Sequence, residues 1–229
     1  MASKRRDRER KPARKPPKLE PKRRLLVVCE GEVTEREYLQ GYERWAKNAT
    51  VRVEVADERG DPKKVVEIAK DLAEKASTEA RKKDDEFIAF DEVWCVFDRD
   101  EHDSNRFHGA IQMAQANGFQ LAVSNPCFEL WLLLHFRASP GMRHRHEVQR
   151  MVSGFVPGFE KHVRFEDYAS GVGRAATRAR RLDEDASAMN EFFRNPTTGV
   201  YGLTDSISRK DPVDGTGEAD GGPKEDDEG

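Results

Sequence analysis

The chain has 229 residues and a formal net charge of −3, with 36% of its residues charged and 36% hydrophobic. This length allows one domain of ordinary size with a sizeable core, or one domain with a helical extension. Residues 1–24 hold twelve Lys and Arg against three Asp and Glu, whereas residues 209–229 hold three against eight. We therefore expect a disordered basic arm and a disordered acidic tail, because neither segment has enough apolar surface to bury.

Apolar runs and cysteines narrow the class of protein. The arm lacks the apolar core of a signal peptide, and the longest apolar run, Leu130–Phe136, is too short to cross a bilayer. The three cysteines, Cys29, Cys95 and Cys127, form no C-x-x-C pair, and the first two lie inside apolar runs typical of strands. These features predict a cytoplasmic protein with reduced thiols and no membrane segment.

Strands and helices are expected to alternate over the first half of the chain. Apolar runs predict strands at 24–29, 51–55, 93–97 and 119–123, and helical periodicity predicts helices at 34–47, 65–73, 105–116 and 126–136. Thr34 and Glu37 have the spacing of a capping box, and Asn125-Pro126 is expected to cap the buried helix that follows. This alternation predicts an α/β domain at residues 25–138, with a mostly parallel four-stranded sheet flanked by helices.

After residue 138 the alternation stops. Helices are expected at 144–152, 166–189 and 200–207. We therefore predict that residues 139–208 form a C-terminal helical extension packed on the α/β domain.

Acidic residues follow the ends of two predicted strands. Asp98 and Asp100 come directly after the run Val93–Phe97, and Glu30 ends the first strand. Alternation along an extended chain places the carboxylates of Asp98 and Asp100 on the same side. The carboxyl ends of parallel strands meet at one edge of a sheet, where ligands gather, and paired carboxylates suit Mg²⁺. Asp98, Asp100 and Glu30 are therefore candidate catalytic and metal-binding residues.

Other candidate residues carry weaker signals. Glu35 and Glu129 each lie in the first turn of a predicted helix, where they are candidate ligands of a second metal, although the helix dipole alone favours an acid there. An isolated D-x-D is otherwise typical of a solvated acidic loop. A nucleophilic role for Cys127 would need a basic partner that the sequence does not assign. The six histidines are too scattered for a recognised zinc spacing.

Five segments of the sequence together carry a resemblance to a known family. They are VVCEGEVTEREYL (27–39), GDP (60–62), VWCVFDRDEH (93–102), SNPCFELWLLLHF (124–136) and NPTTGVY (195–201). They resemble the RloB-like family, a group of bacterial phage-defence proteins related to the topoisomerase-primase (Toprim) domain. The resemblance implies a Toprim-like α/β fold in which Glu30, Asp98 and Asp100 bind Mg²⁺ or Mn²⁺ and carry phosphodiester chemistry. It also implies an ABC-type ATPase as a partner and a role in abortive infection.

Three functions remain open at this point. A Mg²⁺-dependent nuclease acting on DNA or RNA is the leading hypothesis. A haloacid-dehalogenase-like phosphatase also has D-x-D after a strand, but its motif expects Thr or Val where His102 stands, and Glu30 would have no use. The alternative is a non-catalytic Toprim-like subunit that binds nucleic acid and regulates an ATPase. The sequence leaves the oligomeric state open.

Overall fold

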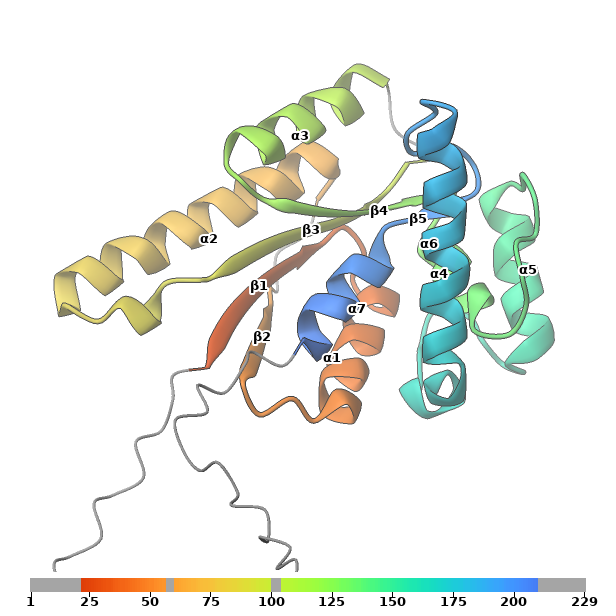
Figure 1. Ribbon diagram of the computed structural model, residues 1–229, viewed down its shortest axis with the longest axis horizontal. Coiled ribbons are helices and arrows are strands. Elements are labelled where there is room, and N and C mark those ends of the chain that lie inside the picture. The colour runs from red at the N-terminus through yellow and green to blue at the C-terminus, as the bar shows by residue number, and fades with distance from the viewer. Residues whose placement is uncertain (1–21, 57–59, 100–103, 210–229) are drawn as a thin grey trace, which may run out of the picture.

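The computed structural model describes residues 22–56, 60–99 and 104–209 (Figure 1). Within these ranges the chain forms a sheet with strand order β2-β1-β3-β4-β5, made of β1 (Arg23–Cys29), β2 (Val51–Val55), β3 (Glu92–Asp98), β4 (Gln120–Asn125) and β5 (Thr197–Thr198). β1 to β4 are parallel, and β5 pairs antiparallel with β4. The expected Toprim-like α/β fold is confirmed, but the expected number of strands was wrong. β5 has only two residues, too few for the alternation that identifies a strand.

Seven α-helices flank the sheet in the described part of the chain. They are α1 (Thr34–Ala46), α2 (Pro62–Lys83), α3 (Ser104–Ala116), α4 (Glu129–Leu134), α5 (Arg145–Phe155), α6 (Val172–Ala188) and α7 (Val200–Ser208). α2 and α3 cover one face of the sheet, while α1 and α7 lie on the other (Figure 1). The helix expected at 166–189 is divided, because two 3₁₀ turns, Phe165–Asp167 and Ala169–Gly171, precede α6. Among the described residues, no helix combines the length and the hydrophobicity that a membrane span needs.

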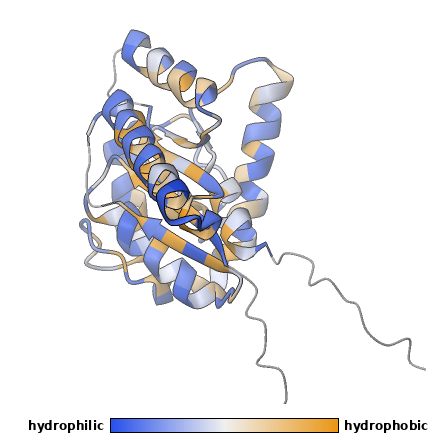
Figure 2. Cartoon of the chain, turned by 90° about the vertical axis from the view of Figure 1, so that its left-hand side faces the viewer, coloured by the Kyte–Doolittle hydropathy of each residue, from blue (hydrophilic) through white to orange (hydrophobic). Residues whose placement is uncertain are grey.

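The alternating side chains of the strands divide the core in two. On β1, Leu25 and Val27 belong to the core on the α1 side, whereas Leu26 and Val28 belong to the core under α2 and α3. Figure 2 shows the strands largely in the hydrophobic colour and much of the outer helix surface in the hydrophilic colour. Because both faces are covered, the strands appear in the sequence as continuous apolar runs.

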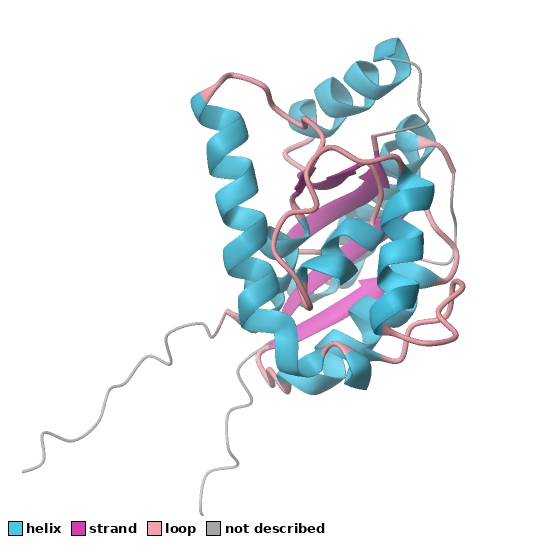
Figure 3. Ribbon diagram, turned by 90° about the vertical axis from the view of Figure 1, so that its right-hand side faces the viewer, coloured by secondary structure: helices cyan, strands magenta, loops and turns pink. Residues whose placement is uncertain are grey.

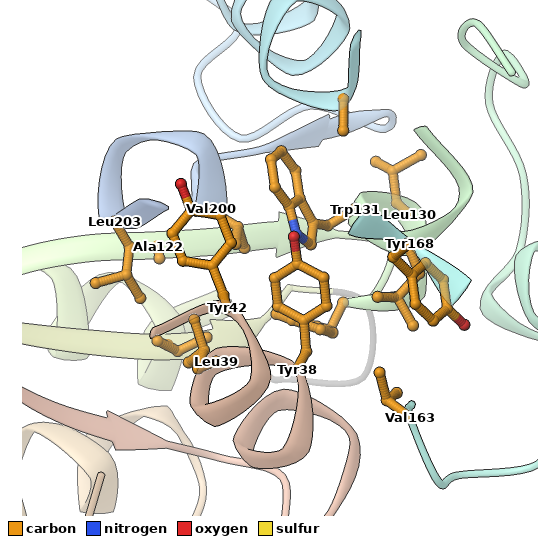
Figure 4. Packing of buried hydrophobic residues seen from close by; sticks show 14 of the residues in the cluster. Tyr38, Leu39, Tyr42, Ala122, Leu130, Trp131, Val163, Tyr168, Val200 and Leu203 are labelled. Atoms are coloured by element: carbon orange, nitrogen blue, oxygen red, sulfur yellow. The ribbon is translucent and has the colours of Figure 1, made fainter. Parts of the chain in front are cut away.

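An aromatic cluster joins the C-terminal helices to the sheet. Tyr38 of α1 lies at its centre and makes edge contacts with Trp131 of α4 and with Tyr168, at ring-centroid distances of 6.1 and 6.2 Å (Figure 4). Its ring also makes an edge contact with Phe165, at a ring-centroid distance of 5.3 Å. The side chains of α4 are almost completely buried, as its apolar sequence predicted. Aromatic edge contacts add to the free energy of burying these rings, so the extension and the sheet share one core.

Two predicted helix caps were wrong. The hydroxyl of Thr34 donates to the carbonyl oxygen of Lys161 at 2.8 Å, and no side chain caps α1. Asn125 ends β4 instead of capping a helix, since its amide donates to the carbonyl oxygen of Phe193 at 2.6 Å and α4 begins at Glu129. Polar side chains that resemble local caps therefore bind distant parts of the chain.

Candidate active site

The first two acids of the site meet because their strands are neighbours. β1 and β3 pair in parallel with Cys29 opposite Val96, so Glu30 and Asp98 emerge at the same edge. Figure 3 shows the arrowheads of the long strands directed toward this side of the molecule. The backbone N–H of Asp98 donates to Oε2 of Glu30 at 2.9 Å. The predicted meeting of Glu30 and Asp98 at one edge is therefore confirmed.

Two further acids join this edge from the starts of helices. Glu35 lies in the first turn of α1 and Glu129 in the first turn of α4, and each is only 7% exposed. Both line a cavity of about 260 Å³ together with Asp98. Nε2 of Gln149 donates to Oε1 of Glu129 at 3.1 Å, which fixes this carboxylate at the cavity wall. The cavity is large enough for a phosphate group and several waters.

Burial and mutual repulsion raise the pKa values of two acids of the site, Asp98 and Glu35. Burial raises the pKa of Asp98 well above its usual value, the negative charges of Glu35, Glu129 and Glu30 raise it further, and Arg145 opposes the rise. Burial likewise raises the pKa of Glu35 to about 7, although nearby backbone N–H groups lower it, and the charges of Glu129 and Glu30 add to the rise. The cluster therefore favours bound protons or a nearby cation at neutral pH.

Gly31 allows the close approach of Glu35. A Cβ atom at position 31 would overlap the carboxylate of Glu35. The glycine that follows Glu30 thus leaves room for a second acid against the same turn. Any side chain at this position would displace the end of Glu35, because the carboxylate is more easily moved than the backbone.

The C-terminal extension forms the opposite wall of the cavity. Arg145 and Gln149 both line it from α5, one helical turn apart. Nη2 of Arg145 lies 3.9 Å from Oδ2 of Asp98, and their side chains are 21% and 16% exposed. Sequence reasoning missed Arg145 and Gln149. The only signal was the basic run around Arg145, and nothing local relates it to Asp98.

A short strap, Lys161–Val163, completes this wall. Lys161 lines the cavity, and its carbonyl oxygen accepts the hydrogen bond from Thr34. Oε2 of Glu37 accepts from the backbone N–H of Val163 at 2.6 Å, and Oε1 of Glu37 lies 2.8 Å from Nδ1 of His162. Thr34 and Glu37, expected to cap their own helix, therefore hold the strap against the start of α1.

The structure bears differently on the other predicted site features, which are Asp100, the metal site and Cys127. Asp100 lies outside the described residues, so its place beside Asp98 stays a prediction. Across ranges 22–56, 60–99 and 104–209, no three His, Cys, Asp or Glu side chains form a group that could hold a metal ion. The carboxylates lining the cavity still have the chemistry that a hard cation prefers. Burial, followed by the charge of Glu129, raises the pKa of the Cys127 thiol, which disfavours a thiolate nucleophile.

A mostly parallel sheet with acids at the carboxyl ends of adjacent strands places the protein in the Toprim-like α/β class. The profile described as "RloB-like protein" matches residues 25–207. The chain therefore belongs to the RloB-like family, as the five sequence segments predicted. No curated protein matches the chain.

Proposed function

We propose that the protein is a metal-dependent nuclease that hydrolyses phosphodiester bonds of DNA or RNA. Mg²⁺ or Mn²⁺ would be held by Asp98, Asp100 and Glu30, with Glu35 and Glu129 as further ligands or proton carriers. The observation that carries the proposal is the contact between Glu30 and Asp98 beside a cavity lined by two more buried acids. Such a concentration of perturbed acids costs stability, and it is typical of a site retained for function.

Each side chain has a distinct task in this proposal. A bound divalent cation supplies Lewis acidity toward the phosphate and lowers the pKa of a bound water. Glu30 accepts a hydrogen bond from the N–H of Asp98, which holds its carboxylate at the end of β1 beside Asp98, where it would bind the cation or carry a proton. Glu35, with a pKa of about 7, is matched to accept and return a proton at neutral pH. Arg145 faces Asp98 and is placed to contact a phosphate oxygen.

We extend the proposal to the setting of the reaction. The resemblance to phage-defence proteins supports a role in abortive infection, in the cytoplasm, with an ABC-type ATPase as partner. The chain of events would begin with a signal passed by the ATPase and end with cleavage of nucleic acid. Copurification of the ATPase with the full chain tests this part independently of cleavage.

One observation favours the alternative, a non-catalytic Toprim-like subunit. Arg145 supplies positive charge beside Asp98, so the cavity has a built-in cation where a metal would otherwise compensate the acids. In that case the protein would bind nucleic acid and regulate the ATPase without cutting. Metal binding, measured by calorimetry, separates the two functions because only the nuclease requires it.

The deciding experiment measures cleavage by the purified full chain. Single- and double-stranded DNA and RNA are incubated with Mg²⁺, Mn²⁺ or EDTA, with and without the ATPase. We expect metal-dependent cleavage that falls by about a hundredfold or more in Asp98→Asn. Asp71→Asn, an exposed position on α2, is the matched control and should cleave like the wild type. Equal cleavage by Asp98→Asn, or none by the wild type with its partner, would contradict the nuclease proposal.

A further inference from the structure

Basic side chains gather on α5, the helix that forms the outer wall of the acidic cavity, and on the segment just before it. Arg143 lies two residues before the start of α5, and His146 and Arg150 lie on the helix one turn apart. All three are exposed, and we call them the α5 rim. None of the three is among the residues that line the cavity.

Helix geometry places the rim next to the cavity. Arg145 and Gln149 line the cavity, so their row of α5 faces it. His146 and Arg150 each follow one of these residues by a single position, which turns them by about 100° around the helix axis. Nδ1 of His146 also lies 3.4 Å from Oε1 of Gln149, whose amide binds Glu129 in the cavity. His146 and Arg150 therefore form the row of side chains adjoining the cavity row, and Arg143 lies two residues before the start of the helix.

The charge of the rim is not neutralised by neighbouring acids. Three arginines elsewhere in the C-terminal half do form ion pairs, Arg164 with Asp167, Arg180 with Asp205 and Arg194 with Glu191. Arg143 and Arg150 instead donate to carbonyl oxygens, those of Met142 at 2.8 Å and His146 at 3.3 Å. Neither is ion-paired with a carboxylate among the residues that the structure describes. Two exposed guanidinium charges on this segment are thus available to a ligand.

The backbone that carries the rim is held in place. The N–H of Arg143 donates to Oδ1 of Asn195, and Nδ2 of Asn195 donates to the carbonyl oxygen of Arg143, at 3.3 and 2.7 Å. Glu147, an acid in the same segment, accepts from the N–H of His144 at 3.0 Å and so caps the helix. A ligand would meet a surface that is already ordered, which lowers the entropy cost of binding.

We infer that the α5 rim binds the phosphodiester backbone of a nucleic-acid strand and leads it into the cavity, where Arg145 meets the phosphate to be cleaved. This inference rests on the proposed nuclease function. Guanidinium groups bind phosphate oxygens well, and contacts to phosphates fix position without reading sequence. The acids of the cavity repel a polyanion, so positive charge outside the cavity has to hold the strand.

The test compares matched variants of the full chain in a binding assay with labelled DNA and RNA in EDTA. Arg143→Gln/Arg150→Gln removes two charges from the rim, and Lys75→Gln/Lys82→Gln removes two charges from exposed positions on α2, on the other face of the sheet. We expect the rim variant to bind about tenfold more weakly at about 50 mM salt, with a salt slope lower by about two. The α2 variant should bind like the wild type. The wild type and both variants keep the basic arm, so its contribution to binding is the same in each.

A charge-preserving pair, Arg143→Lys/Arg150→Lys, separates charge from structure. It should keep most of the affinity, because lysine also binds phosphate as a point charge. Equal weakening in the rim and α2 variants, an unchanged rim variant, or a lysine pair as weak as the glutamine pair would each overturn the inference.

Cleavage assays run in parallel show whether the inference about the rim or the proposed nuclease function is wrong. If the wild type cleaves with Mg²⁺ and the Arg143→Gln/Arg150→Gln variant binds normally, the inference about the rim is wrong and the proposed nuclease function is supported. If nucleic-acid binding depends on the rim but neither Mg²⁺ nor Mn²⁺ supports cleavage, the proposed nuclease function is wrong, whereas the rim is still a nucleic-acid-binding surface. A wild type that binds neither DNA nor RNA would overturn both.

Discussion

Replacing Glu35 by Gln is expected to stabilise the metal-free protein at alkaline pH. The pKa of Glu35 rises from 4.5 to about 7 on folding, chiefly through burial. Because the folded pKa is raised, the stability linked to its proton is present below pH 4.5 and is lost as the pH rises through 7. At 1.36 kcal/mol per pKa unit, the loss amounts to about 3 kcal/mol at pH 8. Glutamine resembles the neutral carboxyl and should avoid this loss.

The pH dependence of the wild type alone would conceal this effect. Burial lowers the pKa of His135 from 6.5 to about 4, against the influence of its backbone hydrogen bonds. A buried base of this kind costs stability as the pH falls from 6.5 through 4, in the direction opposite to Glu35. The two slopes overlap and offset one another between these pH values. The informative quantity is therefore the difference in unfolding free energy between Glu35→Gln and the wild type.

Urea unfolding in EDTA at pH 5 and pH 8 measures that difference. We expect a gain of about 3 kcal/mol at pH 8 and less than about 1 kcal/mol at pH 5. Glu37→Gln is the control on the same helix, since hydrogen bonds from His162 and Val163 outweigh burial and lower the pKa of Glu37. This control should lose stability at pH 8. A gain for Glu35→Gln that is equal at both pH values, or absent at pH 8, would refute the reasoning.

Three further predictions concern the acids and the arm. Asp98→Asn should raise the melting temperature of the metal-free protein at pH 8 in thermal unfolding, because its pKa is also raised; a lower melting temperature would contradict this. Gly31→Ala should displace the carboxylate of Glu35 and reduce metal-dependent cleavage with an unchanged circular dichroism spectrum, so full activity would count against the geometry. Deleting residues 1–22 should leave the melting temperature nearly unchanged but flatten the salt dependence of nucleic-acid binding, and an unaltered slope would show that the arm makes no phosphate contacts.

The main strands were predictable because they are buried on both faces. β1 and β3 appear in the sequence as continuous apolar runs, which few other structures produce. β5 was not predictable, because its two residues form a strand only by pairing with the edge of β4. The predictions of the two helix caps were wrong for a related reason. Thr34 and Asn125 carry the right groups for local caps, but distant backbone atoms compete for them and win.

The site was predictable only where strand ends define it. Glu30 and Asp98 could be placed together, since adjacent parallel strands end at one edge. The contact of Arg145 with Asp98 joins residues 47 positions apart through the packing of α5, and no local pattern encodes it. The tasks of Glu30, Asp98 and Asp100 in binding metal stay predictions.

The division of the cavity between two parts of the chain bears on the order in which the protein is synthesised. The cavity acids Glu35, Asp98 and Glu129, together with Glu30 beside Asp98, leave the ribosome first, and the wall formed by α5 and the strap follows. Under the proposed function, a nascent chain would already contain the acids but would still lack the wall and the rim that deliver the nucleic-acid strand. A cell would thereby be protected from cleavage by incomplete chains made on its own ribosomes.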